Sequence, residues 1–370
     1  MDSGASHHLR NLFAPELLRA NLEREGVERT TLSFYRYVRL ADPSALRNTL
    51  YAEWERIGVL GRVYLASEGI NAQVSLPSSD VDRFRKCLDA RSEFVGVPFK
   101  IALEEDAPSF IKLTIKVKKK LVADGLADDA FDVTNVGEHL SASAFNERLA
   151  SGATVVDMRN NYESAIGHFE GAYLPKADKF HGALAEVLER LEDRKSDEVL
   201  LYCTGGIRCE KASAYLKHHG FTNVGQLHGG IIDYAHQVKR EGLDNKFKGR
   251  NFVFDGRMAE RISDDVVSAC MQCGATSDRI ANCMEESCNL LLVQCEACAN
   301  KYDDCCSPSC REIHQLPTAV QHAWRKGRLT RSTVAKAITD TMALRTRIRA
   351  EEELLALNGT IHPELTDENK

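Results

Sequence analysis

Several features that would narrow the function at once are missing from this sequence. No apolar run approaches the roughly 18 residues that a membrane-spanning helix needs, and the first apolar stretch is too short and interrupted for a signal peptide. Internal repeats and low-complexity tracts are also absent. The net charge of −6 is unremarkable for 370 residues. We therefore expect a cytoplasmic protein that has no membrane partner.

Two cofactor patterns are missing as well. No Gly-x-Gly-x-x-Gly follows a predicted strand, so the sequence contains no nucleotide-cofactor motif. A two-histidine-one-carboxylate iron site requires paired histidines and an acid, and no spacing here demands one. His168, His228 and His236 stand singly, and we interpret them as structural or loop residues.

The segment after the apolar run 199–202 carries the most specific chemistry. A buried strand there is followed by a cysteine, two glycines and a predicted helix at about 209–220. The N–H groups of such a turn and the positive end of the helix favour a thiolate. We therefore predict a nucleophile at Cys203 and an oxyanion-binding guanidinium at Arg208. The residues between them are Thr204, Gly205, Gly206 and Ile207.

The number of residues between Cys203 and Arg208 distinguishes between two kinds of cysteine chemistry. Cysteine phosphatases use Cys-x5-Arg to fit a phosphate, whereas Cys-x4-Arg is tighter and suits one extra sulfur. The loop resembles that of a rhodanese, a sulfurtransferase domain with a persulfide cysteine and a parallel sheet, and segments 154–159, 167–172 and 224–231 resemble its other motifs. The alternative is a buried cysteine before an ordinary strand-to-helix turn.

Three residues near the loop carry further predictions. Asp157 and Arg159 are expected to pair with each other and brace the scaffold. Cys209 either resolves a persulfide or disulfide on Cys203 or is a small buried residue on the sheet-facing side of its helix.

Nine of the twelve cysteines lie between positions 270 and 310. Cys-x2-Cys knuckles direct two sulfurs to one tetrahedral zinc ion, and two looser pairs suggest a second site. Redox-active cysteines and disulfides are the alternatives, although the odd count argues against disulfides. We predict one or two structural zinc ions, held by Cys270, Cys273, Cys283, Cys288, Cys295, Cys298, Cys310 and either Cys305 or Cys306.

A different order of elements precedes the rhodanese-like part. Strands are predicted at 31–38, 61–66, 70–76 and 99–103, and helices at 42–57 and from 78 or 79 to about 89. This βαββαβ order is the split βαβ of ferredoxin-like, or acylphosphatase-like, domains. A further strand at 112–117 leads into three consecutive lysines.

The predicted fold class is therefore a multidomain α/β and α+β protein. We expect an N-terminal extension at 1–29, a ferredoxin-like domain at 30–120, a linker at 121–132, a rhodanese domain at 133–245, a cysteine-rich zinc module at 246–316, and a basic helical tail at 317–370 with a disordered end.

Positive charge gathers at two places. One is a strip of Lys112, Lys116, Lys118, Lys119 and Lys120, with Lys100, Tyr35 and Tyr37 expected nearby. It favours RNA binding at Lys116, Lys118, Lys119 and Lys120, or else it is a solvated edge strand protected from pairing. The other is the tail, where arginine-rich helical sequence after a zinc module suits phosphate-backbone binding. The candidates in the tail are Arg325, Lys326, Arg328, Arg345, Arg347 and Arg349.

Three segments together carry a more specific resemblance, namely 66–72, 203–213 and 251–255. They resemble the bacterial TrhO (YceA) family of rhodanese-like proteins. This resemblance implies a tRNA uridine hydroxylase that uses O2 to convert wobble uridine in the anticodon arm to 5-hydroxyuridine. It also implies that Cys203 is the catalytic residue, as thiolate or persulfide.

Two functions remain as hypotheses. In the first, which the resemblance favours, the sulfur of Cys203 adds to C6 of uracil and makes C5 electron-rich toward an oxidant. In the second, a sulfurtransferase carries a persulfide from Cys203 to an RNA or protein acceptor. A thiol regulator or binding module is a third possibility. We expect tRNA rather than DNA as partner, with a sulfur or electron donor that the sequence does not identify.

Overall fold

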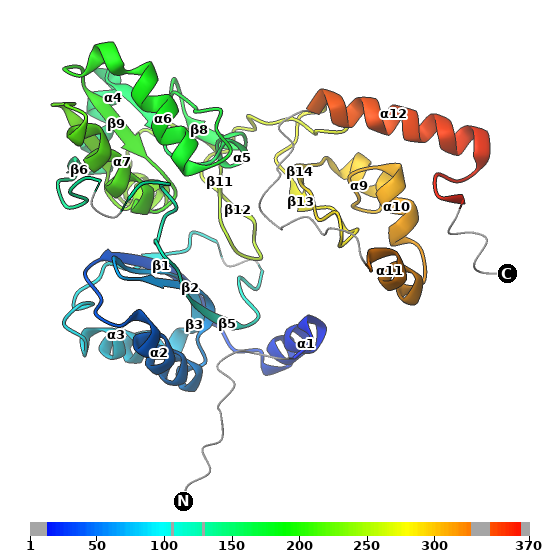
Figure 1. Ribbon diagram of the computed structural model, residues 1–370, viewed down its shortest axis with the longest axis horizontal. Coiled ribbons are helices and arrows are strands. Elements are labelled where there is room, and N and C mark those ends of the chain that lie inside the picture. The colour runs from blue at the N-terminus through cyan, green and yellow to red at the C-terminus, as the bar shows by residue number, and fades with distance from the viewer. Residues whose placement is uncertain (1–12, 105–106, 128–129, 327–340, 364–370) are drawn as a thin grey trace, which may run out of the picture. The chain divides into compact units, whose positions relative to one another are not determined.

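The computed structural model describes residues 13–104, 107–127, 130–326 and 341–363. The chain forms two compact units (Figure 1). The first comprises residues 1–161, 169–246 and 251–261, and the second comprises 162–168, 247–250 and 262–370. Arg328 and residues 364–370 of the predicted disordered end lie outside the described residues.

The first unit contains the elements of the predicted ferredoxin-like domain. They follow α1 (Pro15–Glu25), which lies in the predicted N-terminal extension. These elements are β1 (Arg29–Tyr37), α2 (Pro43–Ile57), β2 (Leu60–Ala66), β3 (Gly69–Pro77), the 3-10 helix η1 (Ser78–Asp80), α3 (Val81–Asp89), β4 (Lys100–Ile101) and β5 (Leu113–Val117). The strands form one sheet in the order β4-β1-β3-β2-β5, in which only β5 pairs parallel to its neighbour, β2. The βαββαβ prediction is confirmed, with β5 added at one edge.

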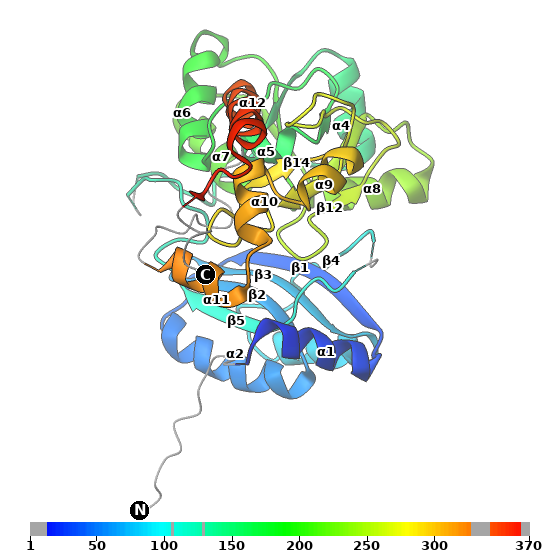
Figure 2. The ribbon, with the colours of Figure 1, turned by 90° about the vertical axis from the view of Figure 1, so that its right-hand side faces the viewer.

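Alternation along β1 gives this sheet two different faces. Phe34 is buried with Trp54 of α2 and Phe84 of α3, so the two helices and the core lie on one side of the sheet (Figure 2). Tyr35 and Tyr37 therefore project from the opposite face. That face carries the contacts to the rhodanese-like part described below.

The rhodanese-like part contains a four-stranded parallel sheet in the order β6-β10-β9-β7. The elements of the rhodanese-like part are β6 (Glu138–Leu140), α4 (Ala142–Ala150), β7 (Thr154–Asp157), α5 (Asn161–Ser164), β8 (Gly167–Phe169), α6 (Phe180–Arg190), the 3-10 helix η2 (Glu192–Arg194), β9 (Val199–Tyr202), α7 (Ile207–His218), β10 (Val224–Leu227) and α8 (Gly230–Glu241). Of these, β8 lies outside the four-stranded sheet. Every residue of β9 is buried, because this strand lies inside the sheet and helices cover both faces. Such a strand is apolar throughout, as its sequence Val-Leu-Leu-Tyr shows.

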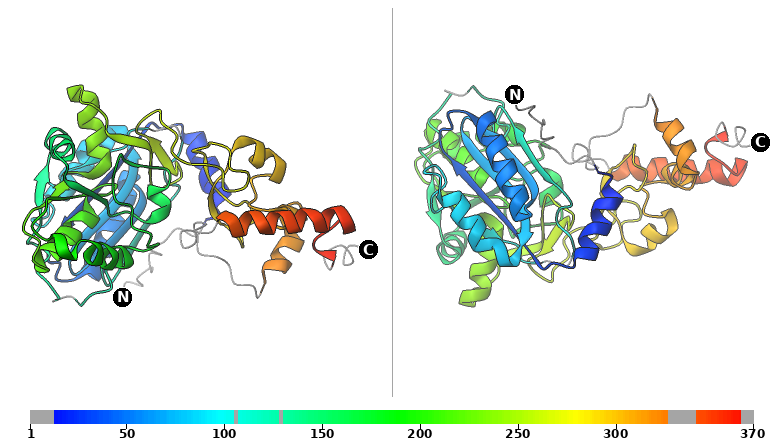
Figure 3. Two further views of the ribbon diagram at one scale, coloured as in Figure 1. Left: turned by 90° about the horizontal axis from the view of Figure 1, so that it is seen from above. Right: turned by 90° about the horizontal axis from the view of Figure 1, so that it is seen from below.

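The second unit is built around its cysteines. The remaining elements of the chain are β11 (Phe247–Phe252), β12 (Ala259–Arg261), β13 (Ile280–Asn282), β14 (Leu291–Val293), α9 (Glu296–Tyr302), α10 (Pro308–His314), α11 (Thr318–Arg325) and α12 (Thr341–Asn358). One small core joins Cys270 and Cys298 to Leu344 and Ile348 of α12, the red helix of Figures 1 and 3. No helix within the described ranges is both long and apolar enough to cross a membrane.

Candidate active site and cysteine clusters

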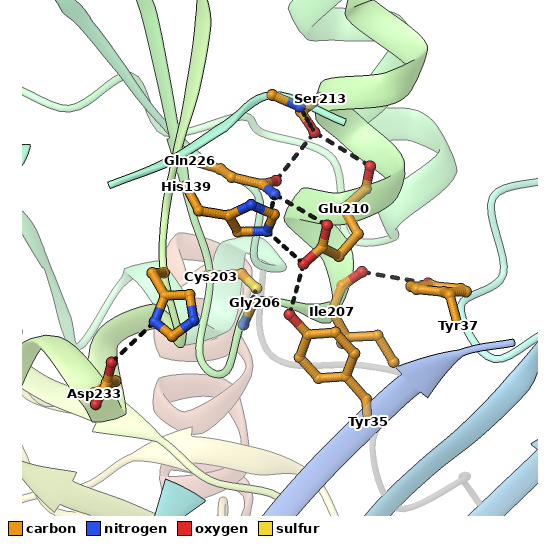
Figure 4. Close-up of polar contacts among 12 residues, drawn as sticks. Tyr35, Tyr37, His139, Cys203, Gly206, Ile207, Glu210, Ser213, Gln226 and Asp233 are labelled. Atoms are coloured by element: carbon orange, nitrogen blue, oxygen red, sulfur yellow. Dashed lines mark hydrogen bonds and ion pairs between the residues drawn. The ribbon is translucent and has the colours of Figure 1, made fainter. Parts of the chain in front are cut away.

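Cys203 directly follows β9 and lies at the carboxyl end of the parallel sheet, where open α/β sheets place their ligands. The backbone N–H of Gly206 donates a hydrogen bond to the Cys203 sulfur at 3.1 Å (Figure 4). Gly206 has a φ of 100° and precedes α7, so a glycine suits this position. The Arg208 guanidinium lies 3.3 Å from the Thr204 hydroxyl, across the short loop that includes Gly205.

The surroundings of Cys203 favour the thiolate. Burial raises the pKa of this thiol, but the Cys209 thiol, the Arg208 guanidinium and helix N–H groups outweigh it and lower the pKa to about 6. Burial and the neighbouring Cys203 raise the pKa of Cys209 well above its usual range. Cys209 therefore stays protonated within the core, and its hydrogen bond to the Cys203 sulfur favours the thiolate form of Cys203. Its burial fits the simpler of the two predictions for this residue.

A second pair of glycines supports the loop from behind. A Cβ on Gly230 would lie 2.6 Å from the carbonyl oxygens of both Cys203 and Thr204. The backbone N–H of Ile231 donates to the Cys203 carbonyl at 3.0 Å. The first residues of α8 thus hold the active loop through backbone contacts that only a glycine permits.

Two tyrosines of β1 close the other side of the loop (Figure 4). The Tyr35 hydroxyl donates to Glu210 at 2.9 Å and lies 2.7 Å from where a Cβ on Gly206 would be. The Tyr37 hydroxyl donates to the Ile207 carbonyl at 3.3 Å. Sequence analysis expects both tyrosines near the lysine strip; in the structure their hydroxyl groups contact α7 and the active loop that precedes it.

Glu210, in the first turn of α7, is the centre of a polar network. Its carboxylate also lies 3.0 Å from Nε2 of His139 and accepts from Gln226 at 3.0 Å. Burial raises the pKa of Glu210, but hydrogen bonds to His139, Gln226 and Tyr35 lower it by more. The pKa is therefore below its usual value, and the carboxylate stays charged. Sequence analysis assigned no role to His139, Glu210 or Gln226; the signals available were the places of Glu210 in the segment 203–213 and of Gln226 in the segment 224–231.

Lys211, the next residue, connects two of the family segments. Its side chain is 1% exposed, and its ammonium group pairs with Glu68 at 2.9 Å and with Asp124 at 2.7 Å. Glu68 belongs to the segment 66–72, which therefore contacts the segment 203–213 through a buried ion pair. Such a pair fixes geometry more than it adds stability.

Asp157 and Arg159 pair with each other, as predicted. Both side chains are fully buried, and the guanidinium and carboxylate lie 2.6 Å apart. The single histidines also have structural contacts: His236 lies 2.9 Å from the Ile101 carbonyl, His168 lies 2.9 Å from the Ser164 carbonyl, and His228 lies 3.3 Å from Asp233.

Eight of the nine clustered cysteines form two groups of four. Within each group the sulfur atoms lie within 4.8 Å of one another, and the groups are Cys270, Cys273, Cys295 and Cys298, and Cys283, Cys288, Cys306 and Cys310. Cys305 is in neither group. Its carbonyl accepts hydrogen bonds from the side chains of Gln272 and Gln294, and the adjacent Cys306 supplies the sulfur.

The sulfur separations fit a tetrahedral metal site. Cys273 and Cys295 have sulfurs 3.6 Å apart, and Cys306 has its sulfur 3.7 Å from Cys288 and 3.6 Å from Cys310. Four sulfurs about 2.3 Å from a zinc ion would be separated by about 3.8 Å, whereas a disulfide requires about 2.0 Å. Both groups can therefore hold a metal ion, and none of the cysteines forms a disulfide.

Comparisons with known proteins agree with this architecture. The chain matches the family models of a UPF0176 acylphosphatase like domain at 29–121, a Rhodanese-like domain at 141–237 and a Rhodanase C-terminal region at 248–311. A protein of Leptospira interrogans named tRNA uridine(34) hydroxylase is 56% identical over 87% of this chain and 88% of its own length. One of the same name from Pectobacterium carotovorum is 48% identical over 86% of this chain and 91% of its own. The chain belongs to the tRNA uridine(34) hydroxylase family.

The predicted family is thus confirmed. A solved rhodanese-like domain protein from Staphylococcus aureus is 21% identical, covers 26% of this chain and 90% of its own, and has a TM-score of 0.22, which is too low to add to the assignment.

Among the candidate RNA contacts of this hydroxylase-family chain, three arginines are engaged within the second unit. Arg325 pairs with Glu285 and Glu286, Arg345 donates to the Cys270 carbonyl, and Arg347 donates to the Cys306 sulfur at 3.4 Å. In the first unit Lys120 pairs with Asp124. Those that remain exposed are Lys116, Lys118, Lys119, Lys326 and Arg349.

Proposed function

We propose that this chain hydroxylates C5 of uridine 34 in tRNA, with O2 as co-substrate and Cys203 as nucleophile. The observation that carries the proposal is the buried Cys203 thiol, whose pKa is lowered to about 6, against the effect of burial, by Cys209, Arg208 and N–H donors, in a chain that shares 56% identity with a relative of that name. A tRNA substrate implies a cytoplasmic enzyme that acts on the anticodon arm.

The chemistry begins at the sulfur. The Cys203 thiolate adds to C6 of uracil, and the electron pair moves to an enolate that makes C5 nucleophilic. Arg208 and the loop N–H groups stabilise the negative charge. C5 then bonds to O2. Overall, C5–H becomes C5–OH, the second oxygen atom leaves as water, and an external thiol reductant supplies two electrons and two protons. Loss of the C5 proton and of the sulfur from C6 restores the ring.

We also propose that each four-cysteine group holds one structural zinc ion. Four thiolates at tetrahedral spacing are a typical zinc ligand set, and such sites stabilise small modules that lack a large core. The zinc ions have no part in the steps above. They would hold the second unit together.

Deletion of the gene, followed by mass spectrometry of tRNA nucleosides, tests the proposed reaction. We expect 5-hydroxyuridine derivatives to disappear, to return with the wild-type chain or the Cys87→Ser variant, and to stay absent with Cys203→Ala. Loss of thiolated nucleosides with hydroxylation intact would instead establish the sulfurtransferase alternative.

A further inference from the structure

A pocket of about 480 Å³ opens between β4 and α8, inside the first unit. Lys100 lines it from the edge of the ferredoxin-like sheet, and Asp233, His236, Lys239 and Arg240 line it from α8. Nothing in the proposed reaction uses this pocket. Three of its lining residues are cationic and one is acidic, and Phe99 and Ile101 complete the lining, so the balance of charge favours an anion.

Lys100 connects the pocket to the active loop. Its Cδ lies 3.7 Å from where a Cβ on Gly205 would be, and its ammonium group lies 4.5 Å from the centre of the Tyr35 ring. Only 8% of the residue is exposed. Burial lowers the pKa of Lys100 to about 8, against the raising effect of Asp233, Cys203 and Glu210, so the side chain is mostly charged at neutral pH. Among the described residues, it has no carboxylate within ion-pair distance.

The cations of α8 are available to a ligand. Lys239 is exposed, and the one ion pair of Arg240 within the described part of the chain is with Glu241 at the surface, where both side chains are well exposed. Surface pairs of this kind contribute little and are readily exchanged. The Asp233 carboxylate accepts a hydrogen bond from Gln237 at 2.9 Å and lies near His228, which offsets part of its charge.

We propose that this pocket binds a phosphodiester group of the RNA next to the nucleotide that reaches Cys203. The inference rests on the proposed function and adds a substrate-positioning site to it. Phosphate oxygens accept charge-assisted hydrogen bonds from lysine and arginine, and an open pocket lets the strand continue on both sides of the bound group. Because Lys100 borders both the pocket and Gly205, a phosphate held there lies beside the active loop.

The lysine strip on β5 cannot hold a phosphate at the same place as the pocket, because it lies at the opposite edge of the sheet. The sheet order β4-β1-β3-β2-β5 places Lys100 at one edge and Lys116 at the other. A strand of RNA bound along β5 would have to cross the width of the sheet to reach the β4 edge, where the pocket lies.

Binding and single-turnover hydroxylation of an anticodon stem-loop RNA test the site in the full chain. The variant Lys239→Ala/Arg240→Ala should bind about tenfold more weakly. The slope of log Kd against log salt should fall by about 0.7, because one phosphate of the single strand is no longer neutralised. The matched control Arg56→Ala/Lys86→Ala removes two exposed cations from α2 and α3 and should bind as wild type.

Neutral methylphosphonate linkages, placed one at a time around uridine 34, locate the phosphate that the pocket binds. One of them should weaken wild-type binding about tenfold and leave the double variant unaffected. Equal losses in wild type and variant at every linkage, or equal binding by the variant and its control, would overturn the pocket proposal while leaving hydroxylation untouched. RNA binding with the expected pattern but without hydroxylation by the wild-type chain would support the pocket and contradict the proposed reaction.

Discussion

The molecule uses cysteine sulfur in two contrasting ways. Cys203 is one thiolate among N–H groups and a guanidinium, and its own backbone is held by Gly230 and Ile231. In the second unit, each group of four cysteines places its sulfurs within 4.8 Å of one another. A thiolate that has only donors around it can attack an electrophile. Four thiolates that face one another repel until a cation joins them, so they suit a metal.

The largest effect is expected when the sulfur of Cys203 is removed. Cys203→Ala should reduce hydroxylation by at least about 1000-fold, because the neighbouring Cys209 thiol is buried with a raised pKa and is a poor replacement nucleophile. Product formation on tRNA in vitro measures the loss, and an unchanged Tm shows that the fold survives. Cys87→Ser is the control, since Cys87 hydrogen-bonds to Glu53 in the ferredoxin-like domain. Activity in Cys203→Ala within tenfold of wild type would remove Cys203 from the mechanism.

Removing one sulfur from a cluster should act on metal content and stability. Cys283→Ser should lower the zinc content from two ions per chain to one and lower the Tm by about 5 °C or more. Cys305→Ser is a close control, because Cys305 lies next to a ligand in the sequence but outside both groups. Elemental analysis with thermal unfolding gives both quantities. Equal zinc loss in the two variants would mean that the ligand set is different.

The pH dependence of alkylation compares the reactive thiol of Cys203 with the ordinary thiol of Cys87, which lies in the same compact unit. A lowered pKa means that the reactive thiolate forms as the pH rises through about 6, so modification of Cys203 should reach half its plateau rate there. Cys87 should react only at a pH above the usual pKa of a thiol, because burial and Glu53 raise its pKa. Peptide mass spectrometry follows both residues in one sample.

Arg208→Gln supplies the matching variant for this titration. Loss of the positive charge disfavours the thiolate, so the midpoint for Cys203 should move upward and that of Cys87 should stay in place. A midpoint near the ordinary thiol value in the wild-type chain would contradict the thiolate assignment.

The smallest expected effect concerns the backbone around the single sulfur. In Gly206→Ala the new methyl group meets the Tyr35 hydroxyl at 2.7 Å in an unfavourable φ region, so hydroxylation should fall about tenfold. Adding Tyr35→Phe should restore part of the rate, since it removes the contacting oxygen. Gly230→Ala should not be rescued in this way, because its methyl group meets backbone oxygens. Steady-state rates of Gly206→Ala and Gly230→Ala, each with and without Tyr35→Phe, provide the test.

The parts that sequence predicts well are those with local signals. The strand predicted at 31–38, the helix predicted at 42–57 and the Cys203–Arg208 turn each depend on neighbouring residues, and each has the expected structure. The Asp42 carboxylate accepts from the N–H groups of Ser44 and Ala45, as an N-cap should.

What sequence could not supply were partners distant in the chain. Tyr35 and Glu210 are hydrogen-bonded across 175 positions, and nothing in either segment identifies the other. The arginines of α12 show the same limit from the other side. Their charge is visible in the sequence, but the hydrogen bond from Arg345 to the Cys270 carbonyl is not. Cys305 and Cys306 are equivalent by spacing, and only the fold decides which sulfur enters the group of four.

The buried ammonium group of Lys211 has a consequence for how this protein can be dissected. Its two carboxylate partners, Glu68 and Asp124, both lie outside residues 133–245, while Cys203 lies on the loop that begins the same helix. A rhodanese module excised at those boundaries would lose both counter-charges and the tyrosine cover of its loop. Its cysteine would then sit in a different electrostatic setting, so the reactivity of such a fragment would describe a different thiol from the one in the intact chain.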